Sequence, residues 1–392
     1  MVNNFMYYVP VRVVFGQGKL NETGIYAKQY GKKALIVTTG TFFKENGLVE
    51  RLSKILKDSG VESEYFSDVN PNPLCTQIDN GANFAKAAGC DVIIGLGGGS
   101  AIDAAKGIAV AIGHNAPVWD YCPANPNAKD VTDKTLPIIA ITTTSGTGSH
   151  ISPYSVITNP ETKEKPGMGS DHIYAKVAIV DPELMVSLPA KITASTGFDV
   201  LAHAIEAYTS NGSTPITDLY CEQAINLVGK YLRRAVENGA DMEARTAMAY
   251  ADTLSGFSIA VAVITLCHSM AHAVGGVCET VHGESLAAMT PHTMRFSMNS
   301  RPEKFKKIGM LLRDECCCGD DGECCNLERS VQEVEKLIKD IGMDIPLGKQ
   351  GVKESDLEEI AEGTIGYMAG SVDLDPRKAS KEDIIDLLRK SL

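Results

Sequence analysis

The pattern of hydrophobic residues changes character near residue 185, and no other feature of the sequence constrains the fold as strongly. Before it, β-branched runs such as "KKALIVTTG", "CDVIIGLGGG" and "LPIIAITTTSG" alternate with helical stretches such as 47–59 and 77–89. Strands that alternate with helices in this way form parallel sheets covered on both faces. We therefore expect an α/β domain with a Rossmann-like parallel sheet over residues 1–185.

After residue 185 the pattern is almost entirely helical. It predicts helices at 189–209, 214–238, 243–263, 283–299, 303–315, 327–341, 354–369 and 380–391. Two of these helices have clear start signals, Thr214-Pro215 and the box Ser380-x-x-Asp383. Because 392 residues exceed what one hydrophobic core usually supports, we predict a second, all-helical domain over residues 186–392.

Charge and composition limit the kinds of partner and the cellular compartment that we expect for this chain. A net charge of −12 argues against nucleic acid or a membrane surface as a partner, since both require a basic face. The N-terminus lacks the pattern of a signal peptide, and no apolar run approaches the roughly 18 residues of a membrane span, so we expect a cytoplasmic protein. The cysteine cluster 316–325, "CCCGDDGECC", matches no ordinary zinc spacing and is expected to hold reduced thiols.

Two loops of small residues follow predicted central strands. "GLGGGSAIDAAK" at 95–106 opens a helix, so its backbone can approach a pyrophosphate while helix N–H groups point at it. Its glycine spacing is a near miss to the dinucleotide fingerprint, and the absence of Gly-Lys-Ser/Thr excludes a Walker A loop. "TTTSGTGS" at 142–149 ends the next strand. Two such loops at one edge of a sheet indicate a dinucleotide site.

A stripe of polar residues crosses an otherwise apolar helix in "GFDVLAHAIEAY" at 197–208. Asp199, His203 and Glu206 stand at i, i+4 and i+7, which places them on one helix face. Two more histidines, His268 and His272, share a face in "CHSMAHAVGG", and another follows in "VHGE". One carboxylate and several imidazoles on facing helices suit a divalent metal such as Fe²⁺ or Zn²⁺. Spacing alone leaves open which of the later histidines bind it and whether Glu206 does.

These motifs, together with "VAIVDPEL", resemble in order and spacing those of the iron-containing (group III) alcohol dehydrogenases, over essentially the whole chain. The resemblance implies an N-terminal nucleotide-binding domain and a C-terminal helical domain. It also implies that the four metal ligands are Asp199, His203, His268 and His282. His272 would then lie beside the metal, either as a catalytic proton relay or as a histidine that supports a ligand.

The resemblance further implies NAD(P)-dependent hydride transfer to or from a small primary alcohol, diol or aldehyde, with the metal as Lewis acid. Relatives of this kind are commonly homodimers or larger homo-oligomers. The candidate cofactor-binding residues are Thr39, Asn72, Gly97, Gly98, Gly99, Ser100, Asp103, Thr143, Thr144, Thr147, Lys165 and Leu184.

Thr39 departs from the usual pattern of the family, in which many members carry an Asp at this position. Such an acid would accept from the ribose 2′-OH and repel a 2′-phosphate. The turn 38–41 offers hydroxyl groups instead, with Lys44 one helical turn on. We therefore expect NADP to be at least tolerated, unless Glu45 folds back over the ribose.

Two other classes of function share parts of this pattern. A metal-dependent lyase or cyclase of the dehydroquinate synthase type would use NAD transiently and would need a basic phosphate pocket for its substrate. A non-enzymatic metal-binding or nucleotide-binding protein would show no net hydride transfer. Reduction of NAD(P) by a panel of alcohols distinguishes the three.

Overall fold

The structure is a computed structural model that describes residues 4–313 and 326–392. By its internal contacts the chain forms two compact units. The sheet unit comprises Val9–Thr144 and Ser149–Met185. The helical unit comprises Met1–Tyr8, Ser145–Gly148 and Val186–Leu392. The cysteine cluster 316–325 lies outside the described residues.

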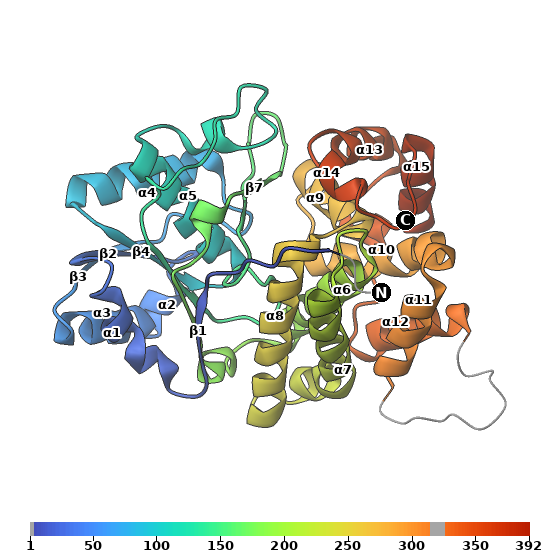
Figure 1. The fold of residues 1–392 in the computed structure, drawn as a ribbon, viewed down its shortest axis with the longest axis horizontal. Coiled ribbons are helices and arrows are strands. Elements are labelled where there is room, and N and C mark those ends of the chain that lie inside the picture. Colours follow the sequence, from blue (N-terminus) through green and yellow to red (C-terminus); the bar gives the residue numbers. More distant parts are fainter. Residues whose placement is uncertain (1–3, 314–325) are drawn as a thin grey trace. The chain divides into compact units, whose positions relative to one another are not determined.

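A six-stranded parallel sheet, in the order β1-β8-β5-β4-β2-β3, forms the centre of the sheet unit (Figure 1). Its strands are β1 (Arg12–Phe15), β2 (Lys33–Val37), β3 (Glu62–Phe66), β4 (Val92–Gly97), β5 (Ile138–Thr142) and β8 (Val177–Val180). A separate antiparallel pair consists of β6 (Tyr154–Val156) and β7 (Gly167–Gly169). The predicted Rossmann-like α/β arrangement is confirmed.

Helices cover both faces of this sheet because its central strands are continuous apolar runs, and every residue of β4 and β5 is buried. Successive side chains of a strand point to opposite faces. Thus Ile36 packs with α3 (Leu48–Asp58), whereas its neighbour Leu35 packs with α4 (Cys75–Ala88) and α5 (Gly99–His114). The shorter helices of the unit are η1 (Lys19–Glu22), α1 (Thr23–Ala27), α2 (Phe42–Glu45), η2 (Val118–Tyr121), η3 (Asp171–Ile173) and η4 (Pro182–Met185).

The strand register gathers several loops at one edge of the sheet. Gly97 at the end of β4 lies opposite Thr142 at the end of β5, and Thr142 lies opposite Val180 of β8. The loops that follow these strands therefore share the carboxyl edge, where open α/β sheets bind their ligands.

No strand occurs after Val186 in the part of the chain that the structure describes, as the sequence predicts. The longer helices are α6 (Ala190–Thr209), α7 (Pro215–Glu237), α8 (Met242–Ala262), α9 (Leu266–Cys278), α10 (His282–Ser297), α11 (Pro302–Leu311), α12 (Leu327–Asp340), α13 (Leu357–Gly366) and α15 (Lys381–Lys390). Short turns are η5 (Met298–Ser300), η7 (Leu347–Gln350), η8 (Glu354–Asp356) and α14 (Ala369–Val372).

Both predicted helix starts are confirmed by their capping contacts. The Thr214 hydroxyl accepts the backbone N–H of Thr217 at 3.2 Å, and Ser380 accepts that of Asp383 at 3.1 Å.

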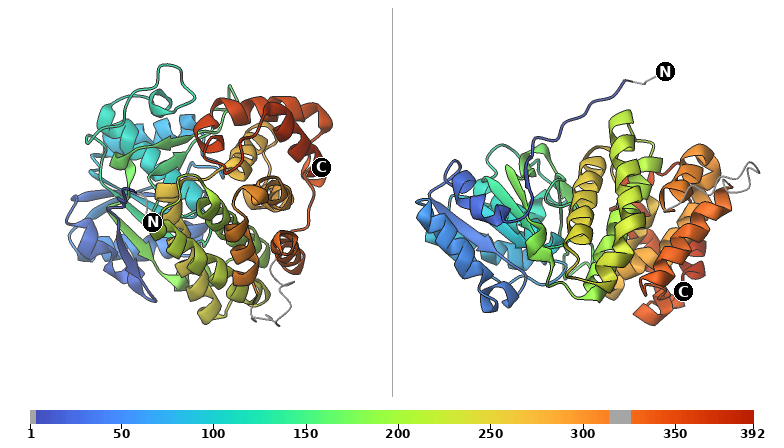
Figure 2. Two further views of the ribbon diagram at one scale, coloured as in Figure 1. Left: turned by 45° about the vertical axis from the view of Figure 1, so that its right-hand side comes forward. Right: turned by 90° about the horizontal axis from the view of Figure 1, so that it is seen from below.

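Helix α6 is the central helix of the helical unit and is buried along almost its whole length. It packs against α7, α8 and α10, with Phe198 and Leu201 in the shared core. Figure 2 shows α6, α7 and α8, coloured green to yellow, side by side. Polar side chains on α6 are therefore enclosed by other helices.

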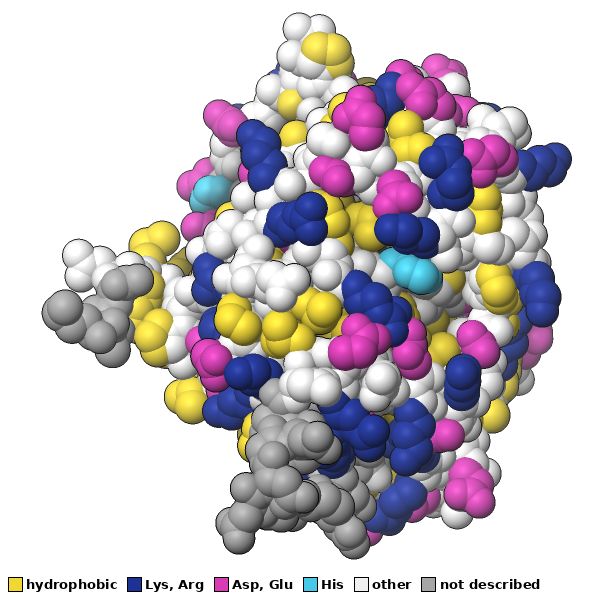
Figure 3. Space-filling model, turned by 90° about the vertical axis from the view of Figure 1, so that its right-hand side faces the viewer, with side chains coloured by type: hydrophobic (Ala, Val, Ile, Leu, Met, Phe, Trp, Pro, Cys, Tyr) yellow, Lys and Arg dark blue, Asp and Glu magenta, His cyan; other side chains and the backbone are white. Residues whose placement is uncertain are grey.

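Among the described residues, no single helix has the length and apolar composition needed to cross a membrane. The pair α8 and α9 passes that test together, but the two helices are bent by 98° at the break between them. Figure 3 shows one face of the structure, on which basic and acidic side chains are interspersed.

Candidate metal centre and cofactor-binding loops

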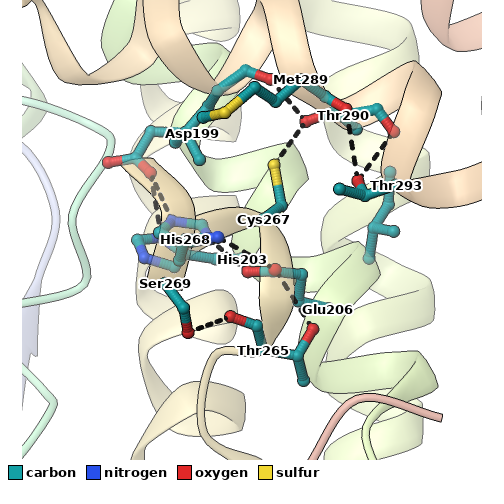
Figure 4. Close-up of polar contacts among 12 residues, drawn as sticks. Asp199, His203, Glu206, Thr265, Cys267, His268, Ser269, Met289, Thr290 and Thr293 are labelled. Carbon is teal, nitrogen blue, oxygen red and sulfur yellow. Dashed lines mark hydrogen bonds and ion pairs between the residues drawn. The ribbon is translucent and has the colours of Figure 1, made fainter. Parts of the chain in front are cut away.

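The polar stripe predicted on α6 is buried inside the helical unit. Asp199, His203 and Glu206 are 3%, 6% and 6% exposed. Because an unpaired charge in such surroundings is costly, each of them must have a partner. His268 of α9 contacts both Asp199 and Glu206 (Figure 4), and the backbone carbonyl of Gly146 contacts His203.

Three predicted ligands meet at one point. The Nε2 atom of His268 lies 3.1 Å from Oδ1 of Asp199, and that of His282 lies 3.8 Å from the same oxygen. The donor atoms of these three residues all lie within 4.8 Å of one another. Three helices, α6, α9 and α10, each contribute one of them. One carboxylate with imidazole nitrogens is a donor set that fits Fe²⁺ or Zn²⁺.

His203, the fourth predicted ligand, lies beside this group. Its ring stacks on that of His268 at a centroid distance of 4.2 Å, and its Nδ1 atom is 3.6 Å from Oδ1 of Asp199. The same nitrogen is 3.2 Å from the carbonyl oxygen of Gly146. Burial lowers the pKa of His203 to about 4, so the ring is neutral near pH 7 and can act as a ligand.

Glu206 contacts His268 and is not one of the three residues whose donor atoms converge. Its carboxylate accepts from Nδ1 of His268, from the backbone N–H of His268 at 3.1 Å and from the Thr265 hydroxyl at 3.1 Å (Figure 4). With Nδ1 bonded to Glu206, Nε2 is the nitrogen that faces Asp199. Burial opposes a charge on His268, yet Glu206 and Asp199 together raise the pKa of His268 to about 9. Binding of a metal at Nε2 would therefore release the proton that this nitrogen holds.

His272 is one turn beyond His268 on α9 and is 6% exposed. Its ring centroid is 5.6 Å from that of His282. It is outside the group of three donors that lie within 4.8 Å of one another. His272 therefore lies next to the three converging residues without being one of them.

Within the sheet unit, residues 97–98 of the first small-residue loop lie beside residues 143–144 of the second. The N–H of Thr143 donates to the carbonyl of Gly97 at 3.0 Å. A Cβ added at Gly98 would lie 3.1 Å from the Thr144 hydroxyl oxygen, so the two loops are in close contact. Helix α5 begins at Gly99 directly after β4, and its first N–H groups are available to an anion.

A buried lysine joins two other predicted cofactor residues. Lys165 is 4% exposed, and its ammonium donates to Oδ1 of Asn72 at 2.8 Å. The backbone N–H of Asn72 donates to the Ser100 hydroxyl at 3.2 Å. Asn72 adopts a left-handed conformation with φ of 60°, which Asn tolerates better than most residues. Leu184, in η4, packs against the apolar residues under one face of the sheet.

Thr39 is half-buried and stands two residues after the end of β2. The Lys44 ammonium lies 5.4 Å from the centroid of the Tyr65 ring, and the Tyr65 hydroxyl contacts the carbonyl of Gly40. The carboxylate of Glu45 accepts from the Thr41 hydroxyl at 2.6 Å. That contact holds Glu45 within its own turn.

The carboxylate of Asp103 is turned inward. It accepts from the Ser149 hydroxyl at 2.5 Å and from the N–H of Val156 at 3.1 Å. Lys106, on the next turn of α5, is fully buried and donates to the carbonyl oxygens of Ser149, Ser152 and Tyr154. Sequence reasoning missed this lysine, because a Lys in a helix is most often exposed.

Both halves of the chain match models of known protein families. The model of the family described as "Iron-containing alcohol dehydrogenase" matches residues 10–182, and that of the "Fe-containing alcohol dehydrogenase family, C-terminal" matches 193–392. The chain is 36% identical to an NAD-dependent methanol dehydrogenase of Bacillus methanolicus, covering 98% of this chain and 99% of that protein. It is 35% identical to a 1,3-propanediol dehydrogenase of Klebsiella pneumoniae, covering 99% and 98%.

A solved structure is equally similar. An archaeal halo-thermophilic alcohol dehydrogenase from a Red Sea brine pool matches with a TM-score of 0.95 and 39% identity, covering 100% of both chains. These relatives favour alcohol oxidation over the lyase and the non-enzymatic alternatives. The chain is an oxidoreductase that acts on CH–OH groups, and it belongs to the iron-containing alcohol dehydrogenase family.

Proposed function

We propose that the buried cluster of α6, α9 and α10 holds the catalytic metal of a dehydrogenase for small primary alcohols and diols, and of a reductase for the matching aldehydes. Its ligands are Asp199, His203, His268 and His282. The observation that carries the proposal is the convergence of Asp199, His268 and His282, whose donor atoms lie within 4.8 Å of one another. When bound, a divalent ion such as Fe²⁺ or Zn²⁺ supplies Lewis acidity that polarises an alcohol or aldehyde oxygen.

Neighbouring groups orient two of the three imidazole rings. Glu206 holds the Nδ1 proton of His268, and the carbonyl of Gly146 holds that of His203. In both rings this leaves Nε2 as the free donor. We include His203 among the ligands because the family resemblance implies it and because its Nδ1 is already occupied.

His272 is proposed as the group that moves a proton to or from the substrate oxygen. Its ring neighbours that of the ligand His282, and an imidazole can both donate and accept a proton in general acid–base catalysis. If it only supported His282, its loss would weaken metal binding instead of the proton-transfer step.

We propose that the cofactor lies on the carboxyl edge of the sheet. The α5 N-terminus and the turn Gly97–Ser100 suit the pyrophosphate, and the buried Lys165 suits a ribose or phosphate oxygen. Thr143, Thr144 and Thr147 offer hydroxyl groups. NAD use is supported by the NAD-dependent relative, and use of NADP by the Thr39 turn with Lys44 beside it.

The substrate proposal follows from the relatives, one of which is named for methanol and another for 1,3-propanediol. The test is a measurement of NAD(P) reduction by methanol, ethanol and propane-1,3-diol, with bound metal counted in each protein. His268→Ala should lose the metal and lower kcat/KM by at least about a hundredfold. His292→Ala, a half-buried histidine elsewhere on α10, serves as the matched control and should keep both. Full metal content and normal turnover in His268→Ala would refute the ligand assignment.

We also propose a cytoplasmic homo-oligomer that does not bind nucleic acid or membranes. The net charge of −12 supports the absence of those two partners. Light scattering coupled to size-exclusion chromatography measures the mass of the particle in solution. A mass equal to one chain of 41.9 kDa would contradict the proposed oligomer.

A further inference from the structure

The segment Ser145–Gly148, part of the second small-residue loop, belongs to the helical unit. It lies in close contact with two helices of that unit. A Cβ added at Gly146 would lie 2.7 Å from the Cβ of Thr196 on α6, and one at Gly148 would lie 2.8 Å from the Cα of Gly256 on α8. Gly148 has a φ of 61°, which strains any residue with a side chain. The segment therefore has little freedom to shift.

Asp252 on α8 holds this segment by its backbone. Its side chain is 1% exposed, and its carboxylate accepts the N–H of Gly148 at 2.8 Å and also the N–H of Gly146. Burial raises the pKa of Asp252 to about 7, and these two N–H donors act in the opposite direction. Burying a carboxyl group lowers the stability of a protein unless its oxygens accept hydrogen bonds, as those of Asp252 do here.

The same segment touches the metal centre through Gly146. The carbonyl oxygen of Gly146 accepts the Nδ1–H of His203 at 3.2 Å. The backbone N–H of Gly146 therefore donates to Asp252, and the backbone carbonyl of Gly146 accepts from His203. Between the two held glycines stands Thr147, which is half-exposed and is a predicted cofactor contact.

We propose that Asp252 is a positioning residue that fixes Ser145–Gly148, so that a metal ligand, His203, and a cofactor hydroxyl, Thr147, are held by one buried carboxylate. The inference rests on the proposed function, since it takes His203 as a ligand and Thr147 as a cofactor contact. On this proposal the affinity for the metal and the affinity for the cofactor both depend on Asp252, although Asp252 contacts neither the metal nor the cofactor.

The test uses Asp252→Asn, which keeps the shape of the side chain but presents an NH₂ group to one of the two N–H donors. Zn²⁺ affinity is measured on the whole protein by competition with a chromophoric chelator. NADH affinity is measured by nicotinamide fluorescence at saturating Zn²⁺. We expect Asp252→Asn to weaken Zn²⁺ binding by about ten- to hundredfold and NADH binding by about fivefold or more.

Three further variants make the test specific. His203→Ala should weaken Zn²⁺ binding alone, because it leaves the segment in place. Ser258→Ala should change neither affinity, because this fully buried hydroxyl of α8 bonds to Leu254 and Thr217 and not to the segment. Gly148→Ala disturbs the segment from the other side and should repeat the paired loss; it replaces Asp252→Asn if that variant does not fold.

Wild-type affinities for both Zn²⁺ and NADH in a folded Asp252→Asn protein would overturn the inference, even if the protein melted at a lower temperature. Loss of only one affinity would overturn it as well. His268→Ala in the same assay separates the two proposals. If it bound Zn²⁺ like the wild type, the proposed metal site itself would be refuted.

Discussion

Glu206 is a buried acid whose oxygens face a histidine side chain, a backbone amide and a hydroxyl. Burial acts to raise its pKa, but the contacts with His268 lower it, so Glu206 is ionised beside the proposed metal ligand. A carboxylate in this position sets the tautomer and increases the basicity of the imidazole that it contacts. It acts on the metal only through His268.

Replacing Glu206 with Gln should weaken metal binding while the protein stays folded. The amide accepts less strongly from Nδ1 of His268, and we expect Zn²⁺ affinity to fall by about tenfold or more. Chelator competition measures this affinity. Glu222→Gln is the control, because the carboxylate of Glu222 on α7 accepts from the Tyr208 hydroxyl and not from His268, so its loss should not change the affinity. Equal affinities in the two variants would show that Glu206 has no part in the site.

Thr39 tests cofactor choice at a single position. An Asp there would repel a 2′-phosphate, to which hydroxyl groups and the ammonium of Lys44 can donate. We expect Thr39→Asp to lower kcat/KM for NADP by at least about tenfold relative to NAD, a difference of roughly 1.4 kcal/mol. Steady-state kinetics with both cofactors decide the question, and an unchanged ratio would remove Thr39 from the account.

Asp375 gives a prediction about pH. It is 6% exposed and accepts from the Ser297 hydroxyl at 2.6 Å. Burial raises its pKa to about 6, so the folded protein binds more protons than the unfolded chain between about pH 4 and pH 6. Its contribution to stability is therefore present at low pH and lost as the pH rises through 6. Relative to the wild type, Asp375→Asn should gain up to about 2–3 kcal/mol of stability across this window. Chemical denaturation of both proteins at pH 4.5 and pH 7 measures the difference in their free energies of unfolding. An equal difference at the two pH values would contradict the prediction.

At the scale of elements, the break between α8 and α9 positions His268, a proposed metal ligand, against α6. Only Val263–Thr265 separate the two helices, which are bent by 98°. The bend brings Thr265 and His268 to Glu206, a residue of α6. Val263 has φ 62° and ψ 168°, a conformation that is unfavourable for a β-branched side chain. The chain therefore carries backbone strain one turn before a proposed ligand.

Val263→Gly should relieve this strain. Residues held in such regions cost about 1–3 kcal/mol, and part of the gain is offset by the greater freedom of Gly in the unfolded chain. We expect the midpoint of thermal unfolding to rise. Val261→Gly, two residues earlier inside α8, should lower the free energy of unfolding by about 1 kcal/mol and so lower the midpoint. If both variants lower the midpoint equally, the backbone at Val263 is not strained.

Helix starts were predictable from the sequence because their signals are local. The Thr214 and Ser380 caps involve residues within three positions of each other. The same holds for the α6 stripe, which follows from the helix period alone. The role of Glu206 was not predictable, because its partner His268 is 62 residues away in sequence and the contact depends on the bend before α9.

At the scale of the whole chain, the motif series predicted the parallel sheet, the helical half and the family. Contacts that join distant residues through backbone atoms remained hidden. Asp252 reaches Gly148 across 104 positions, and Lys106 reaches Tyr154 through its carbonyl oxygen. Backbone donors and acceptors exist at every residue, so no side-chain pattern in the sequence reveals such a pairing. Sequence motifs therefore locate the chemistry, and the structure shows what holds it in place.

The central claim is that α6, α9 and α10 bind a catalytic metal. The most direct measurement is anomalous diffraction at the Fe and Zn absorption edges from crystals of the purified protein. We predict one strong peak about 2.0–2.2 Å from a carboxylate oxygen of Asp199 and from the Nε2 atoms of His203, His268 and His282. A peak bound by other residues, or no peak at this cluster in enzyme that oxidises alcohols, would contradict the account.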